Sequence, residues 1–255
     1  MRKFIFILLA SIVSVSPICA QLLKVTAPYT EMKNAYTIEN DSYSVGFAEN
    51  YGIPIWSFYK FTSGMASGSS AAKEEWQVDS RVKGYKITPK DLANLNQEPV
   101  QLFPKEHASN ASMVVQSTFL TSNILFMPKQ LKDSIWQRLT ESFENIAKKS
   151  GIVYIFSGPI FEKDSFKIKY TLNKHVAVPI AFYRIALYVE DGKAVYKCYR
   201  FSNRIPTDYE RNCDLEDFSY NLYQLEADTG IDFLDRDIDK NFRQEKMEYL
   251  EKRIK

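Results

Sequence analysis

The chain has 255 residues, of which 45% are hydrophobic, 14% aromatic and 25% charged. This composition excludes a disordered or collagen-like protein, and the length suits one domain with a short appendage. Lys and Arg number 33 against 31 Asp and Glu, and two of the basic residues fall in a predicted signal peptide. The mature chain is therefore neutral overall. Binding of nucleic acid would require a local basic patch.

Residues 1–20 have the pattern of a secretory signal peptide. Arg2 and Lys3 precede an apolar run that ends at Val15, and Ala20 completes an acceptable cleavage site. The run is too short to span a bilayer comfortably, and an uncleaved anchor is the alternative. We expect a secreted protein, detached from membranes once the signal is removed, with one domain over residues 21–236 and a charged helical tail over residues 237–255.

Two strands are expected near the start of this domain, over residues 43–47 and 53–59, where bulky side chains alternate. Residues 62–73 are small and polar and predict a loop. The clearest helix covers residues 128–149. Its apolar side chains recur at steps of four and three and form one stripe: Leu131, Ile135, Leu139, Phe143 and Ile146. Gly151 supplies a stop.

The second half of the domain also predicts strands and a helix, from its β-branched and aromatic residues and from a turn signal. Residues 152–156 predict a buried strand, and a β-hairpin is expected around Asp191-Gly192, between residues 176–189 and 194–201. Residues 216–227 predict a second helix. Strands interrupted by helices indicate an α+β fold, built on a twisted, largely antiparallel sheet that is flanked by helices.

The remaining cysteines and two sequons fit an oxidising, secretory route. Cys198 and Cys213 are expected to form a disulfide that closes a loop of about fifteen residues, worth roughly 3 kcal/mol. A pair of metal ligands is the alternative, but a nearby His or third Cys is lacking. Asn40 and Asn110 begin N-glycosylation sequons.

Several segments, in order over residues 43–234, resemble DNA/RNA non-specific endonucleases of the ββα-metal class, and most closely the nuclease-like domain of ectonucleotide pyrophosphatase/phosphodiesterases. The matching stretches are Val45–Phe47 with Pro54–Tyr59, Val78–Val82, Thr118–Ile124 followed by Trp136, Ser157–Phe161, Val178–Tyr183 and Leu225–Phe233. The resemblance implies a twisted antiparallel sheet flanked by helices, in agreement with the pattern of elements.

The resemblance also assigns three site positions. Family members use an Asp-Arg-Gly-His motif, whose His is the general base, an Asn on the long helix that binds a divalent metal, and a Glu that supports the hydrated metal. These positions hold Gln101, Lys132 and Thr140 here. A carboxamide takes up no proton near neutral pH, and an ammonium group repels Mg²⁺. The sequence thus predicts that the chain is not an enzyme and has neither a metal site nor a cofactor.

The predicted role is a binding module for nucleic acid, a nucleotide or a protein partner. The candidate nucleic-acid contacts are Arg81, Lys129, Lys132 and Arg138. Two alternatives stay open. One is an active endonuclease, dependent on Mg²⁺ or Mn²⁺, with relocated groups: His107 as base and Glu106 to orient it. The other is a purely structural domain. The sequence does not predict an oligomeric state.

Overall fold

A computed structural model describes residues 25–65, 74–92, 97–109, 111–162, 175–234 and 242. The predicted signal peptide, the sequon residue Asn110, most of the loop predicted at 62–73 and all of the tail except Phe242 lie outside the described residues. No helix of the described part is long and apolar enough to cross a membrane.

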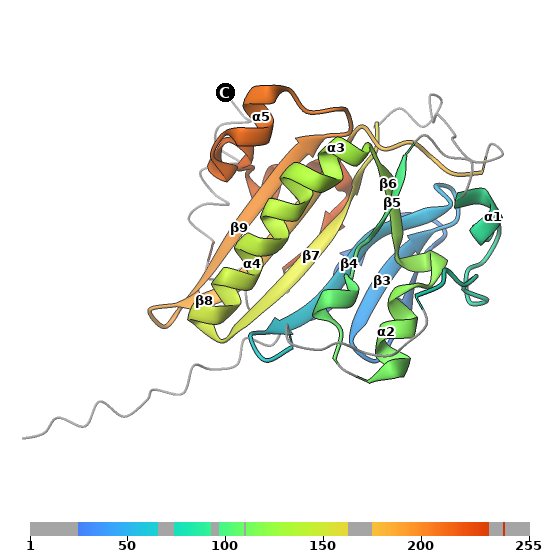
Figure 1. Ribbon diagram of the computed structural model, residues 1–255, viewed down its shortest axis with the longest axis horizontal. Coiled ribbons are helices and arrows are strands. Elements are labelled where there is room, and N and C mark those ends of the chain that lie inside the picture. The colour runs from blue at the N-terminus through green and yellow to red at the C-terminus, as the bar shows by residue number, and fades with distance from the viewer. Residues whose placement is uncertain are drawn as a thin grey trace, which may run out of the picture.

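A six-stranded sheet forms the centre of the molecule, and each pair of neighbouring strands is antiparallel (Figure 1). Its strands, in spatial order, are β2 (Ala35–Glu39), β3 (Tyr43–Ala48), β4 (Ile53–Thr62), β7 (Ile152–Ile160), β8 (Ala181–Glu190) and β9 (Lys193–Ser202). The predicted α+β fold is confirmed. The predicted hairpin is confirmed too, since Asp191 and Gly192 both have a positive φ, as a type I′ turn requires.

Shorter elements surround this sheet. Two small ribbons pair β5 (Glu98–Gln101) with β6 (Ile124–Met127), and β1 (Tyr29–Thr30) with β10 (Ile231–Asp232). The short helices are α1 (Pro89–Leu92), η1 (Lys105–His107), α2 (Ser112–Thr118), η2 (Thr121–Asn123), α5 (Asp208–Asn212), η5 (Leu215–Phe218) and α6 (Leu222–Thr229). The continuous helix predicted at 216–227 is therefore divided. Asn221 causes the break, because its side chain accepts from the backbone N–H of Gln224 and caps α6.

The long helix consists of α3 (Lys129–Leu131), a π-helical turn η3 (Lys132–Trp136) and α4 (Gln137–Ser150). The prediction for residues 128–149 is confirmed, and the helix ends at Gly151, whose φ is 81°. The sequence did not predict the π-helical turn. Such turns are rare and often mark functional sites.

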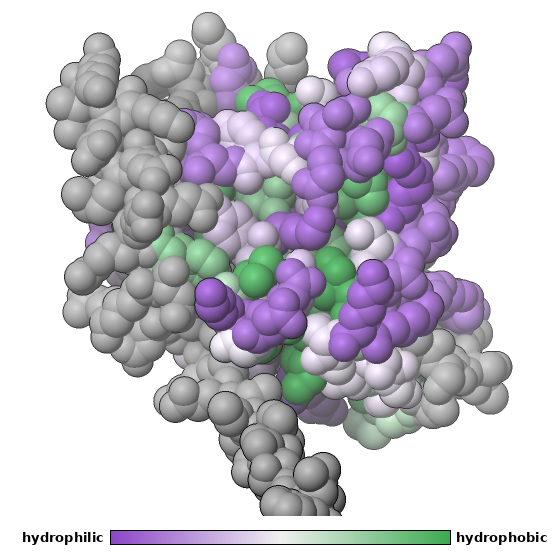
Figure 2. All heavy atoms as spheres, turned by 90° about the vertical axis from the view of Figure 1, so that its left-hand side faces the viewer, coloured by the Kyte–Doolittle hydropathy of each residue, from purple (hydrophilic) through white to green (hydrophobic). Residues whose placement is uncertain are grey.

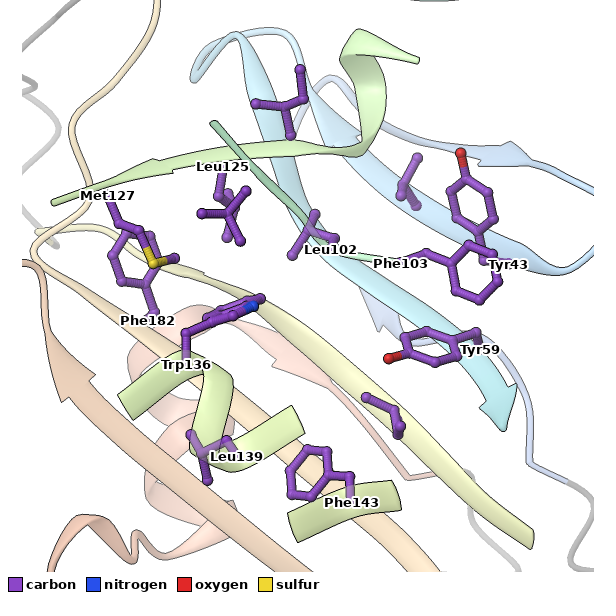
Figure 3. Packing of buried hydrophobic residues seen from close by; sticks show 14 of the residues in the cluster. Tyr43, Tyr59, Leu102, Phe103, Leu125, Met127, Trp136, Leu139, Phe143 and Phe182 are labelled. Carbon is purple, nitrogen blue, oxygen red and sulfur yellow. The ribbon is translucent and has the colours of Figure 1, made fainter. Parts of the chain in front are cut away.

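The sheet has a core on each face. On one face, α4 lies across the sheet in Figure 1, and its apolar stripe is buried there. Figure 3 shows Trp136 between the helix and Phe182, and Tyr43 beside Phe103, with 4.7 Å between the last two ring centroids. The opposite face packs a second cluster that includes residues of α6 and β10. Burial of apolar surface on both faces explains why the sheet strands are so rich in aromatic and β-branched residues.

The disulfide predicted between Cys198 and Cys213 is wrong, because the structure contains no bond between these two residues. Alternation along β9 places Cys198 in the second cluster, on the face opposite α4. Cys213 instead follows α5, and its carbonyl accepts a 2.5 Å hydrogen bond from Arg138 of α4. The spacing of the two cysteines along the chain does not predict that Cys198 lies on the face of the sheet opposite α4.

Candidate functional site

Glu98 and Lys132 meet at the edge where the β5–β6 ribbon reaches the long helix (Figure 1). Glu98 of β5 lies opposite Met127 of β6, and α3 begins two residues after Met127. This connection brings the carboxylate of Glu98 to Lys132, with 3.5 Å between Oε2 and Nζ. The two side chains are 43% and 36% exposed, so solvent reaches both charges.

Gln101, which the resemblance places at the position of the general base, has a structural role. Its Nε2 donates to both the backbone oxygen and the Oγ1 of Thr118 at 3.0 Å, and its Oε1 accepts from the backbone N–H of Lys105 at 3.1 Å. The carboxamide thereby joins β5 to the end of α2 and the start of η1. It cannot accept a proton from water near neutral pH.

Thr140, which the resemblance places at the position of the Glu, binds a buried arginine. Its Oγ1 accepts a 2.6 Å hydrogen bond from Arg184 and donates to the carbonyl of Trp136 at 3.1 Å. The Arg184 guanidinium is fully buried, 4.5 Å from the Trp136 ring centroid and 4.9 Å from that of Phe143. Burial lowers the pKa of Arg184 below its usual value.

These residues do not fit the divalent metal that the family implies. Lys132 places an ammonium group at the position of the metal-binding Asn, and Glu98 already faces that ammonium. Thr140 is committed to Arg184. Within the described ranges, no three His, Cys, Asp or Glu residues come together in a group that could hold a metal ion. Hard cations need several such oxygen ligands, so no reaction step is assigned to a metal here.

His107, predicted as a relocated base, is fully buried. Its Nε2 lies 3.1 Å from Glu144 Oε1, and its Nδ1 lies 3.1 Å from the hydroxyl of Tyr59, which Figure 3 shows in the core. A neutral imidazole with its proton on Nε2 satisfies both partners. Burial lowers the pKa of His107 below its usual value, and Glu144 opposes this effect. The carboxylate that orients His107 is Glu144, whereas Glu106, which the sequence suggested, is exposed.

Arg81 does not belong to the site. Its guanidinium donates to both carboxylate oxygens of Asp79, to the backbone oxygen of Glu39 and to Oδ1 of Asn40. Burial raises the pKa of Asp79, but hydrogen bonds from Arg81 and Ser122 outweigh it and lower that pKa below its usual range. The sequon residue Asn40 is held in the same cluster, with its Nδ2, the atom that carries an N-linked glycan, buried.

The other two basic candidates, Arg138 and Lys129, differ in their surroundings. Arg138 donates to the carbonyls of Arg211 and Cys213 and fixes α5 to α4. Lys129, by contrast, lies three residues before Lys132 at the start of the long helix, and it is 65% exposed in its pair with Asp133. Of the four predicted contacts, the structure brings together only the two lysines.

A cavity of about 790 Å³ lies elsewhere, between α4 and the β8–β9 hairpin. Figure 2 shows this side of the molecule, where hydrophilic and hydrophobic side chains are interspersed. The lining of the cavity carries both signs of charge, and it includes Arg138, Lys149, Glu141 and Glu190. Glu98 and Lys132 do not line it, so the cavity and the candidate chemistry are separate features.

Comparisons with known proteins identify the relatives of this chain. The family model described as DNA/RNA non-specific endonuclease matches residues 22–237. The chain is 23% identical to "Nuclease" of Serratia marcescens, over 78% of this chain and 73% of that protein. It is 24% identical to "Nuclease C1" of Cunninghamella echinulata var. echinulata, over 78% of this chain and 82% of that protein.

The fold has a solved counterpart. A chain in the crystal structure of the EndoG/EndoGI complex superimposes with a TM-score of 0.68 at 17% identity, covering 76% of this chain and 84% of that chain. The identity is low, so this likeness concerns the fold alone.

These findings correct two predictions. The expectation that the chain is not an enzyme is contradicted, because its family and its relatives are nucleases by name. The closer likeness to ectonucleotide pyrophosphatase/phosphodiesterases finds no support in these comparisons. The substitutions at Gln101, Lys132 and Thr140 therefore do not establish that the chain is inactive. Glu98, which the sequence places three residues before Gln101, is an accessible carboxylate at the same edge.

Proposed function

The chain belongs to the DNA/RNA non-specific endonuclease family, and on this premise we propose that it is a nuclease that hydrolyses phosphodiester bonds of DNA or RNA. The observation that carries the proposal is the 3.5 Å approach of Glu98 Oε2 and Lys132 Nζ at the edge to which the resemblance assigns the reaction. A carboxylate beside an ammonium group combines a proton acceptor with a positive charge.

In the proposed reaction, a water molecule attacks phosphorus while Glu98 takes its proton. The bond between phosphorus and the leaving oxygen breaks, and that oxygen takes a proton from solvent, so one water is consumed in each cleavage. Lys132 stabilises the negative charge that develops on the phosphate oxygens. Glu98 suits the role of base better than His107, because a general base must come within hydrogen-bond reach of the attacking water and His107 is fully buried.

The basic groups at this edge support contact with the backbone of the nucleic acid rather than with its bases. Lys129 and Lys132 are single point charges on flexible side chains, and phosphate contacts of this kind carry no sequence information. DNA and RNA share the phosphate charge. We therefore propose that both are substrates.

Export from the cell is also part of the proposal. Arg2, Lys3 and the apolar run that follows support it. Mass analysis of the secreted protein should find a mature chain that begins at Gln21. A chain that retains Met1 inside the cell would contradict export and would leave the proposed activity untouched.

The test is direct. The purified protein is incubated with supercoiled plasmid and with RNA, and the products are separated on gels. We expect both substrates to be cut, and Glu98→Gln to slow cutting by about 10²–10⁴-fold, the usual contribution of a general base. Glu106→Gln is the matched control, because Glu106 is an exposed glutamate eight positions away along the chain. The absence of cutting by the wild type would overturn the proposed function, and equal rates in the two variants would overturn the role of Glu98.

A further inference from the structure

The position that the resemblance assigns to the metal-binding Asn lies in an unusual part of the helix. Lys132 is the first residue of the π-helical turn, which ends at Trp136. A π-helical turn widens the helix and changes the direction of its side chains. The turn begins at the residue that replaces the metal ligand and ends at the residue whose carbonyl receives Arg184.

Three positively charged side chains lie around this turn, together with the carboxylates of Asp133, Glu98 and Glu144. Lys129 and Lys132 lie at its outer side, and the buried Arg184 lies behind it, hydrogen-bonded to Trp136 and Thr140. No carboxylate forms an ion pair with Arg184 in the part of the chain that the structure describes. The ammonium group of Lys132 itself repels a divalent cation and attracts a phosphate.

The acidic partners of the lysines are weakly held. The Lys132–Glu98 and Lys129–Asp133 pairs are both substantially exposed, and exposed ion pairs contribute only about 0.2–1 kcal/mol. A phosphate that carries a full charge can therefore displace either carboxylate from its lysine. Displacement of Glu98 would also free its carboxylate to meet water.

We propose that the Lys132 ammonium takes the place of the family's metal ion and binds a backbone phosphate directly, so that this protein binds nucleic acid without divalent cations. The inference rests on the proposed function, because it concerns the same edge. It assigns the cation at that edge to a side chain of the protein.

The experiment measures binding separately from cutting. Fluorescence anisotropy follows a labelled single-stranded oligonucleotide with phosphorothioate linkages, which resist cutting, in excess EDTA and in Mg²⁺. We expect the two dissociation constants to agree within about twofold. Lys132→Gln should weaken binding in EDTA and reduce the slope of log K against log[salt] by about 0.7, the value for one phosphate contact on a single strand. Lys132→Arg should retain most of the affinity.

Lys149→Gln is the matched control, since Lys149 is an exposed lysine at the far end of the same helix. Loss of binding in EDTA, or equal effects of Lys132→Gln and Lys149→Gln, would overturn the inference. Plasmid cutting by the same preparation reports on the proposed function independently. Cutting that EDTA abolishes would refute the role of Lys132 and leave the nuclease proposal standing, whereas protein that neither binds nor cuts would refute both.

Discussion

The guanidinium of Arg184 donates a 2.6 Å hydrogen bond to the hydroxyl of Thr140, although the two residues are 44 positions apart in the chain. Thr140 lies on α4 and Arg184 on β8, so the contact fixes the long helix to the sheet. The buried charge is also solvated by the carbonyl of Trp136 and by two aromatic rings. A buried charge is tolerated only with such partners.

Replacing Arg184 with Ala should therefore destabilise the fold. It removes a large buried side chain and leaves polar groups of Thr140 and Ser157 without their donor. We expect a loss of about 2–4 kcal/mol in the free energy of unfolding, measured by urea denaturation. Arg204→Ala is the control, because the Arg204–Glu210 pair is exposed and should cost less than about 1 kcal/mol. Equal losses in the two variants would show that the buried contacts of Arg184 contribute no more to stability than an exposed ion pair.

Stability should fall as the pH is lowered through the titration of His107. Burial lowers the pKa of this imidazole in the folded state, so the unfolded chain takes up the proton first. The neutral form contributes stability that is present above about pH 6.5, the ordinary histidine value, and that is lost as the pH falls toward the lower folded pKa. The carboxylates of Glu144 and Glu106 raise the pKa of His107, whereas the charge of Arg184 lowers it in the same direction as burial.

Urea denaturation between pH 7.5 and 5 tests this dependence. The chain has only two histidines, so few other groups titrate in this window. Wild type should lose stability on acidification, and His107→Gln should flatten the curve. A His107→Gln profile parallel to that of wild type would exclude His107 as the source.

Gly46 should tolerate no side chain. A Cβ placed on it would lie 2.1 Å from ring atoms of Trp56, its cross-strand partner on β4, and that ring is buried. Gly46→Ala must shift the indole or the strand, at a cost of about 1–3 kcal/mol in thermal or urea unfolding. Gly64→Ala is the control, since a Cβ there meets nothing within 4 Å and should change stability by less than about 0.5 kcal/mol. A cost at Gly46 no larger than at Gly64 would mean that the Trp56 ring moves freely.

The absence of a bridge between the two cysteines of the domain predicts a simple chemical result. Peptide mapping without reduction should recover the peptides of Cys198 and Cys213 separately. Reductant should leave the unfolding midpoint unchanged. A disulfide that closes a loop of about 15 residues would stabilise the fold by roughly 3 kcal/mol, and this bond is not formed between the two cysteines. A linked pair of peptides would instead show that α5 can approach β9 in a way that this structure does not contain.

The sequence by itself determined the long strands, the long helix, the hairpin and the family. Period-two alternation marked the long strands, the steps of three and four marked the long helix, and Asp191-Gly192 marked the hairpin. Each of these signals is local, because the backbone period decides which side chains share a face. The ordered family segments then indicated the correct fold. They also placed Gln101, Lys132 and Thr140, since short motifs keep their spacing along the chain.

Only the tertiary structure decided which of these side chains lie together. Glu98 and Lys132 meet because β5 pairs with β6 and the helix starts beside that pairing. His107 contacts Glu144, 37 positions away, rather than its neighbour Glu106, and Arg138 donates to carbonyls 73 and 75 positions away. Arg81 pairs with nearby Asp79 and also donates to Asn40, 41 positions away. Contacts of this kind depend on strand order and on which face of the sheet each side chain occupies. Hydrophobic burial determines the strand order and the face of each side chain only when the whole chain packs together. A local sequence pattern therefore does not predict these contacts.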